Sequence, residues 1–281
     1  CFVKDANEIG LMKRAADISC LAHQAAMAYT REGRYEYQVQ ALMEFIFKAS
    51  GASFPAYTSI VAGGNNANVL HYIENKDLLN DKEYLLIDAG CEYHSYASDI
   101  TRTFPVSGRF EGGGRDVYEV VLEAQKKTIQ TAEPGKTLKE LHEVSSKELI
   151  RGLIDLNVLK GDVEENYQQE NHKKYFPHGT SHWLGIDVHD NTPYLTEGLE
   201  DIKFTPGMCF TVEPGLYFPA EDDELPSKLR GIGVRIEDDI LITEKGHENM
   251  TSKAPKEIKD VEQACGRSVK ELEEWQKLLE N

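Results

Sequence analysis

The sequence predicts an α+β fold built from two similar halves, each containing two helices followed by antiparallel strands. Apolar residues recur at helical spacing in two pairs of segments, one at the start of the chain and one after its middle. Short apolar runs broken by Gly and Asn follow each pair, as is typical of strands and hairpins. Residue-by-residue repetition between the halves is weak, so the duplication is an expectation about architecture.

The first pair of helices is predicted at residues 5–29 and 37–50. Asp5 and Glu8 have the spacing of a capping box, in which each side chain accepts a hydrogen bond from the other residue's backbone. Gly51 is a typical helix stop because glycine adopts the left-handed conformation without strain. Strands are expected at residues 59–62, 84–88 and 100–105.

The second half repeats this order, with helices predicted at residues 116–132 and 137–156. Thr137 and Glu140 form a second capping box. Strands are expected at residues 208–212 and 233–243. We interpret Gly112 to Gly114 as a flexible turn between the halves, and residues 168–174 as a surface loop. From Ser268 onward the pattern predicts an amphipathic helix, with its apolar side chains at Val269, Leu272, Trp275 and Leu279.

Composition excludes several classes of protein. With 281 residues, 40% apolar and 28% charged, the chain has the balance of a folded globular protein. A net charge of -17 disfavours a nucleic-acid partner, and no apolar run approaches the roughly 20 residues of a membrane span. Five scattered cysteines argue against a disulfide framework or a thiolate metal site, so we expect a cytoplasmic location. The chain opens at Cys1 without methionine, which leaves a longer native N-terminus open.

Two aspartates stand next to predicted strands of the first half. Asp88 ends the apolar run Leu85-Leu86-Ile87, where a buried carboxylate is costly unless it is paired or bound to metal. Asp99 follows eleven residues later, so a hairpin could bring the two carboxylates together. Two facing carboxylates repel each other, and a divalent cation removes that conflict. For either aspartate alone, a turn or capping role is the commoner one.

Residues 178–190 place three histidines, His178, His182 and His189, among glycines and apolar residues. Imidazole is a common neutral metal ligand, and glycines allow close backbone approach. A lone histidine in such a setting is more often a hydrogen-bonded core residue. Three together favour a functional site without requiring that all of them bind metal.

Two glutamates also stand in apolar strand contexts. Glu213 follows Phe210-Thr211-Val212, and Glu237 follows Val234-Arg235-Ile236. In a continuous strand, Arg235 and Glu237 would project to the same face, so a simple ion pair between them is the plainest interpretation. That interpretation leaves Glu213 without a partner.

One histidine and four carboxylates form an oxygen-rich ligand set that suits Mn²⁺, Co²⁺ or Zn²⁺. Such a set can hold two ions about 3.5 to 4 Å apart, bridged by carboxylates and by a hydroxide that attacks a carbonyl or phosphoryl centre. The residues by themselves therefore predict a two-metal hydrolase, whose candidate ligands are Asp88, Asp99, Glu213, Glu237 and one of the three histidines His178, His182 and His189.

These motifs resemble the pita-bread (M24-type) metallopeptidases, the family of aminopeptidase P, prolidase and methionine aminopeptidase. The resemblance covers nearly the whole chain to about Lys253, with five separated motifs in the family's order. It implies the pita-bread fold, with two pseudo-symmetric halves. Residues 87–93, 181–185 and 230–237 are most similar to aminopeptidase P, and Ser181-His182-Trp183 differs from the prolidase pattern.

The resemblance also implies a role for each ligand. Asp88 would chelate one ion, and His182 and Glu213 would hold the other. Asp99 and Glu237 would bridge both ions, and Glu213 would also act as general base toward the bridging hydroxide.

Four further residues receive roles only through the resemblance. His71, which the residues alone did not single out, and His189 would contact the substrate or the tetrahedral intermediate. His178 would line the site as a supporting histidine. Arg235 would pair with Asp88 and orient it.

The expected activity is hydrolysis of an N-terminal Xaa-Pro bond, with two divalent cations as cofactors. Manganese is the favoured metal, and zinc and cobalt are alternatives. The expected substrate is a peptide with proline in second position, whose missing amide proton and fixed φ fit ordinary proteases poorly. Prolidase, which cleaves Xaa-Pro dipeptides, stays open. A non-catalytic pita-bread binding module and a two-metal phosphoesterase also stay open.

We expect the catalytic domain at residues 1–265 and the C-terminal amphipathic helix at residues 266–281. The resemblance implies a separate N-terminal domain in relatives, which we do not expect within these 281 residues. A homodimer or higher homo-oligomer is left open, whereas nucleic acid and membrane are not expected as partners.

Overall fold

The computed structural model describes residues 2–268. Two pairs of long helices and several short ones account for the helical part of the chain. Their bounds are as follows: α1 (Ala6–Tyr29), α2 (Glu36–Ala49), η1 (Gly64–Asn68), α3 (Gly112–Thr131), α4 (Leu138–Asp155), α5 (Val163–Gln168), η2 (Asn171–Lys174) and α6 (Ile258–Cys265).

The strands form small sheets, with orders β1-β4-β5, β2-β3-β6, β11-β10-β7 and β8-β9. Every pairing between named strands of the described chain is antiparallel. The strand bounds are as follows: β1 (Phe54–Pro55), β2 (Ile60–Gly63), β3 (Tyr84–Asp88), β4 (Cys91–Tyr93), β5 (Tyr96–Ala97), β6 (Thr101–Pro105), β7 (Cys209–Val212), β8 (Gly215–Phe218), β9 (Ile232–Arg235), β10 (Asp238–Thr243) and β11 (Gly246–Asn249).

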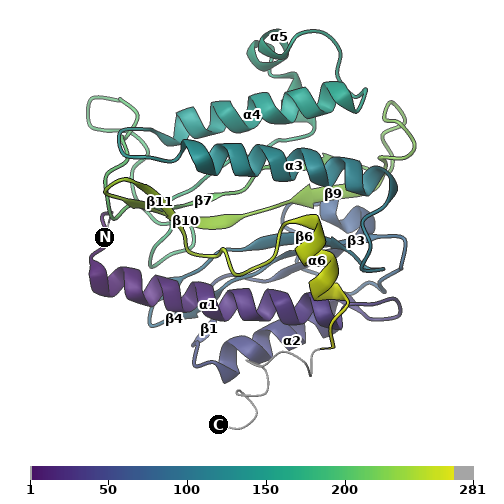
Figure 1. Ribbon diagram of the computed structural model, residues 1–281, viewed down its shortest axis with the longest axis horizontal. Helices are drawn as coiled ribbons and strands as arrows, with labels where there is room; N and C mark the ends of the chain where they lie inside the picture. The colour runs from purple at the N-terminus through teal and green to yellow at the C-terminus, as the bar shows by residue number, and fades with distance from the viewer. Residues whose placement is uncertain (1, 269–281) are drawn as a thin grey trace.

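The two helix pairs lie on opposite sides of the strands, with α1 and α2 on one side and α3 and α4 on the other (Figure 1). The predicted α+β fold with two helix-then-strand halves is therefore confirmed. Apolar side chains of both halves meet in one large buried cluster, which includes Phe47 of α2, Phe104 of β6, Val121 of α3 and Phe218 of β8. Because both halves pack into this one core, their relative position is fixed.

The local signals that define the long helices act as the sequence predicts. The Asp5 side chain accepts hydrogen bonds from the backbone of Asn7 and Glu8, and the Glu8 side chain accepts one from Asp5 N. Thr137 and Glu140 form the same reciprocal pair at the start of α4. These bonds satisfy backbone N–H groups that have no partner inside the helix.

The interpretation of Gly112 to Gly114 as a turn between the halves is wrong, because these residues begin α3. Close packing explains the glycines. A Cβ at Gly113 would lie 2.1 Å from Lys228 O, and one at Gly114 would lie 2.1 Å from the Tyr84 ring. A run of glycines is ambiguous in sequence because it permits both turns and close approach.

Three other expectations need correction. Residues 168–174 are not a plain loop, since they span the end of α5 and all of η2. The expected strand over residues 233–243 is two strands, β9 and β10, interrupted at Ile236 and Glu237. Strand β8 and helix α6 were not predicted. The helix expected from Ser268 lies outside the described residues, apart from Ser268 itself.

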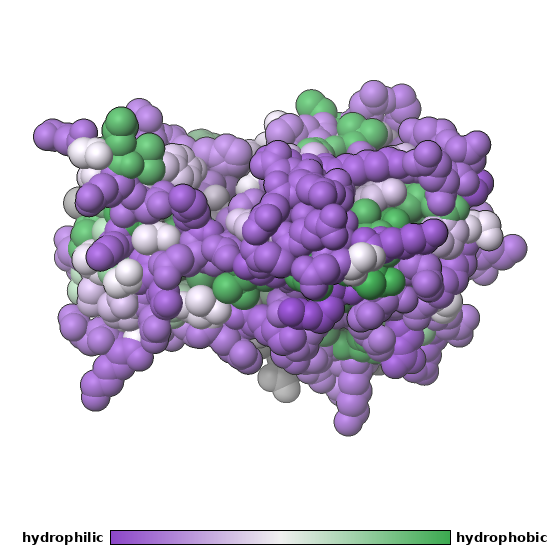
Figure 2. All heavy atoms as spheres, turned by 90° about the horizontal axis from the view of Figure 1, so that it is seen from above, coloured by the Kyte–Doolittle hydropathy of each residue, from purple (hydrophilic) through white to green (hydrophobic). Residues whose placement is uncertain are grey.

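The molecular surface is largely hydrophilic on the face seen in Figure 2, where hydrophobic side chains form small separate groups. This agrees with the net charge of -17. None of the helices among residues 2–268 combines the length and apolar character that a bilayer span requires.

Candidate metal centre

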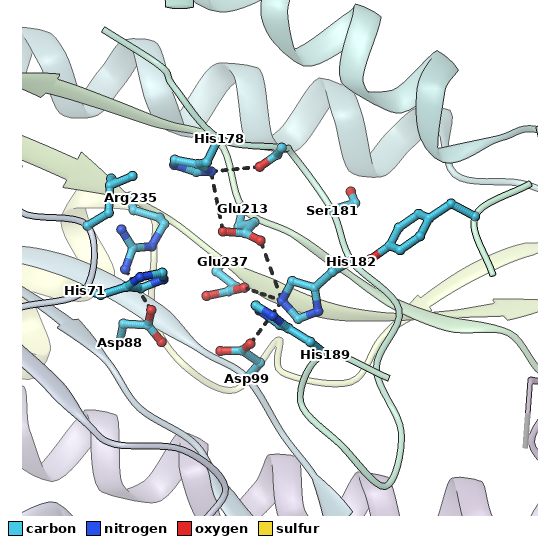
Figure 3. A pocket seen from close by; sticks show the side chains of 13 residues that line it. His71, Asp88, Asp99, His178, Ser181, His182, His189, Glu213, Arg235 and Glu237 are labelled. Atoms are coloured by element: carbon cyan, nitrogen blue, oxygen red, sulfur yellow. Dashed lines mark hydrogen bonds and ion pairs between the residues drawn. The ribbon is translucent and has the colours of Figure 1, made fainter. Parts of the chain in front are cut away.

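All nine predicted site residues line one cavity of about 320 Å³ (Figure 3). They come from both halves of the chain and point toward one another across the cavity. The nine are His71, Asp88, Asp99, His178, His182, His189, Glu213, Arg235 and Glu237.

The first half supplies Asp88 and Asp99 from two paired strands. Asp88 is the last residue of β3, and Asp99 lies two residues before β6, which pairs with β3 so that Asp88 faces Thr101. The chain between them turns back through β4 and β5. The Tyr57 hydroxyl contacts Asp88 Oδ1 at 2.7 Å and Asp99 Oδ1 at 2.5 Å. The expectation that a hairpin brings these carboxylates together is therefore confirmed.

A glycine makes this approach possible, and it yields a testable prediction. A Cβ at Gly90 would lie 1.8 Å from Ser98 O, so Gly90→Ala forces the two arms of the turn apart. We expect the free energy of unfolding to fall by about 3 kcal/mol or more, measured by urea denaturation. Gly10→Ala in α1 is the matched control, since a Cβ there meets nothing within 4 Å and should stabilise the helix by about 1 kcal/mol. A wild-type urea midpoint for Gly90→Ala would contradict the prediction.

The second half supplies His182 and Glu213 from adjacent backbone segments. Thr211 N donates to His182 O at 3.0 Å, and Glu213 N donates to Thr180 O at 2.8 Å. The segment around residues 180–182 therefore runs along the end of β7. This pairing places an imidazole and a carboxylate side by side over the same sheet.

Glu237 joins the two halves. It lies between β9 and β10, and its backbone N donates to Thr101 O at 3.0 Å. Thr101 Oγ1 donates in return to Glu237 Oε2 at 2.6 Å. The 1% exposed Glu237 is thus held against β6 of the other half.

The His182 imidazole is the meeting point of the carboxylates. Its Nε2 lies 3.2 Å from Asp99 Oδ2, 3.6 Å from Glu213 Oε1 and 3.9 Å from Glu237 Oε1. Donor atoms of Asp99, His182 and Glu237 all lie within 4.8 Å of one another. This spacing allows the three side chains to share one cation.

Arg235 pairs with Asp88 and not with Glu237. Its Nη2 lies 2.7 Å from Asp88 Oδ2, whereas β9 ends at Arg235, so Glu237 does not continue that strand face. The simple Arg235–Glu237 ion pair is therefore wrong, and the Asp88 pairing implied by the family resemblance is present. Whether it orients Asp88 toward a metal stays a prediction.

His178 is held from both ring nitrogens. Nδ1 lies 2.7 Å from Gly179 O, which can only accept, so Nδ1 carries the proton. Nε2 then accepts from the Tyr217 hydroxyl at 2.7 Å, and Arg235 Nη1 donates to the same hydroxyl at 2.8 Å. Burial lowers the pKa of His178 to about 3, so the ring stays neutral. These hydrogen bonds are consistent with His178 as a supporting residue that lines the cavity.

Burial and mutual repulsion raise the pKa values of three of the four carboxylates, whereas the hydrogen bond and charge of His182 lower the pKa of Asp99 against the effect of burial. Burial raises the pKa of Glu213 to about 7 and, together with the charges of Asp99 and Glu213, raises the pKa of Glu237 well above its usual value. Burial also raises the pKa of Asp88, against the opposing charge of Arg235. Although burial opposes it, the hydrogen bond with Asp99 and the charge of Glu213 raise the pKa of His182 to about 9.

This donor set fits divalent cations. Four carboxylates and one guanidinium line the cavity, so the ligand set in its ionised form carries more negative charge than Arg235 can compensate. The ligand atoms are oxygens with one imidazole nitrogen, a combination typical of Mn²⁺, Co²⁺ or Zn²⁺ sites. Burial, together with neighbouring carboxylates, raises the pKa values of Glu213 and Glu237, and a bound cation would favour their ionised forms.

Sequence reasoning missed several polar groups behind the ligands, namely Tyr57, Thr101, Tyr217 and Asp239. Tyr57 stands 31 residues before Asp88 in a loop, where no periodic pattern marks it. Asp239 follows Glu237 by two residues, and its carboxylate accepts from Asp99 N. Only Asp239 had a sequence signal, because it lies within a predicted strand rich in acidic residues.

The fold and the cavity define the class of protein. The model of metallopeptidase family M24 matches residues 10–244. Together with the carboxylate and histidine cluster, this shows that the chain belongs to metallopeptidase family M24 and has its pita-bread fold.

Within this family the chain is similar to Xaa-Pro aminopeptidases. It is 46% identical over 260 residues to the Xaa-Pro aminopeptidase of Haemophilus influenzae, covering 92% of this chain and 60% of the relative. It is 44% identical over 259 residues to that of Escherichia coli K12, covering 92% and 58%.

Solved structures show the same likeness. The aminopeptidase PepP of Pseudomonas aeruginosa superposes with a TM-score of 0.92 at 44% identity, over 94% of this chain and 60% of that one. Zinc-substituted E. coli aminopeptidase P in complex with product has a TM-score of 0.91 at 42% identity, over 94% and 59%. The chain thus spans about three fifths of the length of these relatives.

Proposed function

We propose that this protein is a metal-dependent exopeptidase that hydrolyses the N-terminal Xaa-Pro bond of peptides. The observation that carries the proposal is the convergence of nine chemically matched side chains on one cavity. The similarity to Xaa-Pro aminopeptidases over 92% of the chain supports the substrate class.

In this proposal Asp88, Asp99, His182, Glu213 and Glu237 hold two divalent cations. When bound, the cations supply an activated water and Lewis acidity toward the scissile carbonyl. Manganese is our proposed metal, because an oxygen-rich set with a single imidazole suits it. The crossing of ligands from both halves means that neither half could hold both ions alone.

Protein groups then handle the proton and the substrate. Glu213, whose Oε1 faces His182 Nε2, is proposed to take the proton of the attacking water and pass it toward the leaving proline nitrogen. His71 and His189 line the same cavity and are proposed to hydrogen-bond the peptide carbonyls. Neutral His178 would support the wall without exchanging protons, since the protein already occupies both of its ring nitrogens.

A substrate comparison tests the proposal. We expect cleavage of an Xaa-Pro-Yaa tripeptide with Mn²⁺ present and none with chelator, while the Xaa-Pro dipeptide is cleaved at least about 10-fold more slowly, because binding energy from the third residue is lost. Zn²⁺ serves as the second metal arm. Efficient cleavage of the dipeptide alone would indicate a prolidase instead. Hydrolysis of phosphate esters without any peptide cleavage would sink the proposal.

We also propose a reducing compartment such as the cytoplasm. Cys20, Cys91, Cys209 and Cys265 are free thiols, and three of them are buried. The homo-oligomeric state stays a prediction.

A further inference from the structure

His189 reaches the metal cavity without a side-chain hydrogen bond of its own. Its exposed ring rests against the His182 ring, with centroids 4.3 Å apart and planes at 57°. Within residues 2–268 no protein group is hydrogen-bonded to the His189 ring, so its position depends on the backbone loop that carries it. The contacts that hold the loop of residues 185–190 therefore determine the position of His189.

A buried ion pair holds that loop. Lys4 Nζ lies 3.1 Å from Asp190 Oδ2, and the two side chains are only 1% and 14% exposed. The Lys4 backbone is fixed as well, because Lys4 N donates to Gly207 O at 2.8 Å. A residue 185 positions away in sequence thus contacts the immediate neighbour of His189.

The pair sits where two ligand-bearing segments meet. Asp190 N donates to Trp183 O at 2.9 Å, next to His182, and Ala97 N donates to Gly185 O at 2.9 Å, two residues before Asp99. A Cβ at Gly185 would lie 2.4 Å from Asp190 Oδ2 and 3.1 Å from Lys4 Nζ. Glycine at this position leaves the space that the ion pair occupies.

The same N-terminal segment makes a second contact behind the site. The Phe2 ring meets the Trp183 ring edge-on, with centroids 4.9 Å apart. Trp183 directly follows His182. Phe2 and Lys4 therefore contact the residues that directly follow His182 and His189 in the sequence.

We propose that Lys4, through its ion pair with Asp190, is a positioning residue that fixes His189 beside the His182 cluster. Its kinetic consequence rests on the proposed peptidase function. If the pair were purely structural, replacing both residues would restore stability and kcat/KM together, since buried ion pairs can often be replaced at both ends with little loss of stability.

Three variants distinguish a positioning role of Lys4 from a purely structural one. Lys4→Met and Asp190→Asn each leave one buried group without its partner, so each should lower Tm by about 10 °C. The double variant Lys4→Met/Asp190→Asn should recover most of that loss. We nevertheless expect its kcat/KM to stay about 10- to 100-fold below wild type with metal content unchanged, because His189 is displaced.

A double-mutant cycle identifies the group through which Lys4 acts. In a His189→Ala background, the paired substitution should change kcat/KM by less than about 2-fold, because the histidine it positions is already gone. The exposed pair Lys13–Glu248, at 2.8 Å, gives the matched control Lys13→Met/Glu248→Gln, which should leave Tm and kcat/KM unchanged. A double variant with wild-type kcat/KM, or a full effect retained without His189, would overturn the proposal.

A spectroscopic arm stays informative even if the peptidase proposal fails. In zinc-loaded protein with labelled histidine, the His189 ring signal is assigned by its loss in His189→Ala. We expect that signal to shift or broaden in Lys4→Met/Asp190→Asn, while the His71 signal stays in place. An unchanged His189 signal would refute the positioning role, whereas absent peptide cleavage by wild type would refute only the function.

Discussion

Replacing Glu237 with alanine is expected to lower turnover of an Xaa-Pro-Yaa peptide by more than about 100-fold, because groups that merely support metal ligands already contribute 10- to 100-fold. Glu237 contacts both halves of the site, with Oε1 3.9 Å from His182 Nε2 and Oε2 2.6 Å from Thr101 Oγ1. Its loss removes a proposed bridge between the two cations. Calorimetric titration with Mn²⁺ should show weaker binding and fewer than two bound ions.

The variant should remain folded, which makes the result interpretable. The backbone at residue 237 keeps its hydrogen bond to Thr101 O, and the side chain that is lost is a buried acid whose ionised form burial and the charge of Asp99 disfavour. Glu237→Gln, which preserves shape, provides the companion variant. Glu248→Ala, on the surface, is the matched control and should keep wild-type turnover. Near-normal turnover of Glu237→Ala in metal-replete buffer would refute the site assignment.

Cation binding to the metal-free protein is expected to release more than about one proton at pH 7 and about two at lower pH. His182, with a pKa raised to about 9, is protonated at neutral pH. Burial and the charges of Asp99 and Glu213 raise the pKa of Glu237 well above its usual value, which favours its protonated form. Glu213, with a pKa raised to about 7, is about half protonated. All three must lose their protons to act as ligands.

The apparent affinity of the site for cations should depend on pH. Protons and cations compete for the same atoms, so apparent affinity should rise with pH and fall about 100-fold per unit below pH 7, the slope of two released protons. Titration calorimetry in buffers of different ionisation enthalpy counts the released protons. Lys13→Met is the control, because Lys13 is a surface residue that does not line the cavity. Affinity that is flat between pH 6 and 8 would show that these groups do not bind the metal.

The chemistry of the candidate site could be predicted from sequence because each key residue stands out locally. Asp88, Glu213 and Glu237 are charges in apolar strand runs, and His182 lies in a cluster of histidines and glycines. His71 has no such local contrast and was found only through the family resemblance. The structure brings all of these side chains to one cavity, while their catalytic roles stay predictions.

Groups that act across long sequence separations escaped prediction. Tyr57 contacts Asp88 and Asp99, and Lys4 contacts Asp190, yet nothing near either residue in sequence signals the partner. The partner of Arg235 is an intermediate case. The residues alone favoured Glu237, two positions away, whereas the family resemblance implied the pair with Asp88 that the structure contains.

The sequence by itself determined the two helix pairs, the capping boxes of α1 and α4, the α+β class and the types of side chain available for catalysis. Periodicity and capping involve residues three or four apart, so neighbouring residues suffice to specify them. Only the tertiary structure decided which acids converge and that Gly112 to Gly114 begin a helix. It also decided that residues 2–4 support the site, because close packing and burial between distant segments have no local signature.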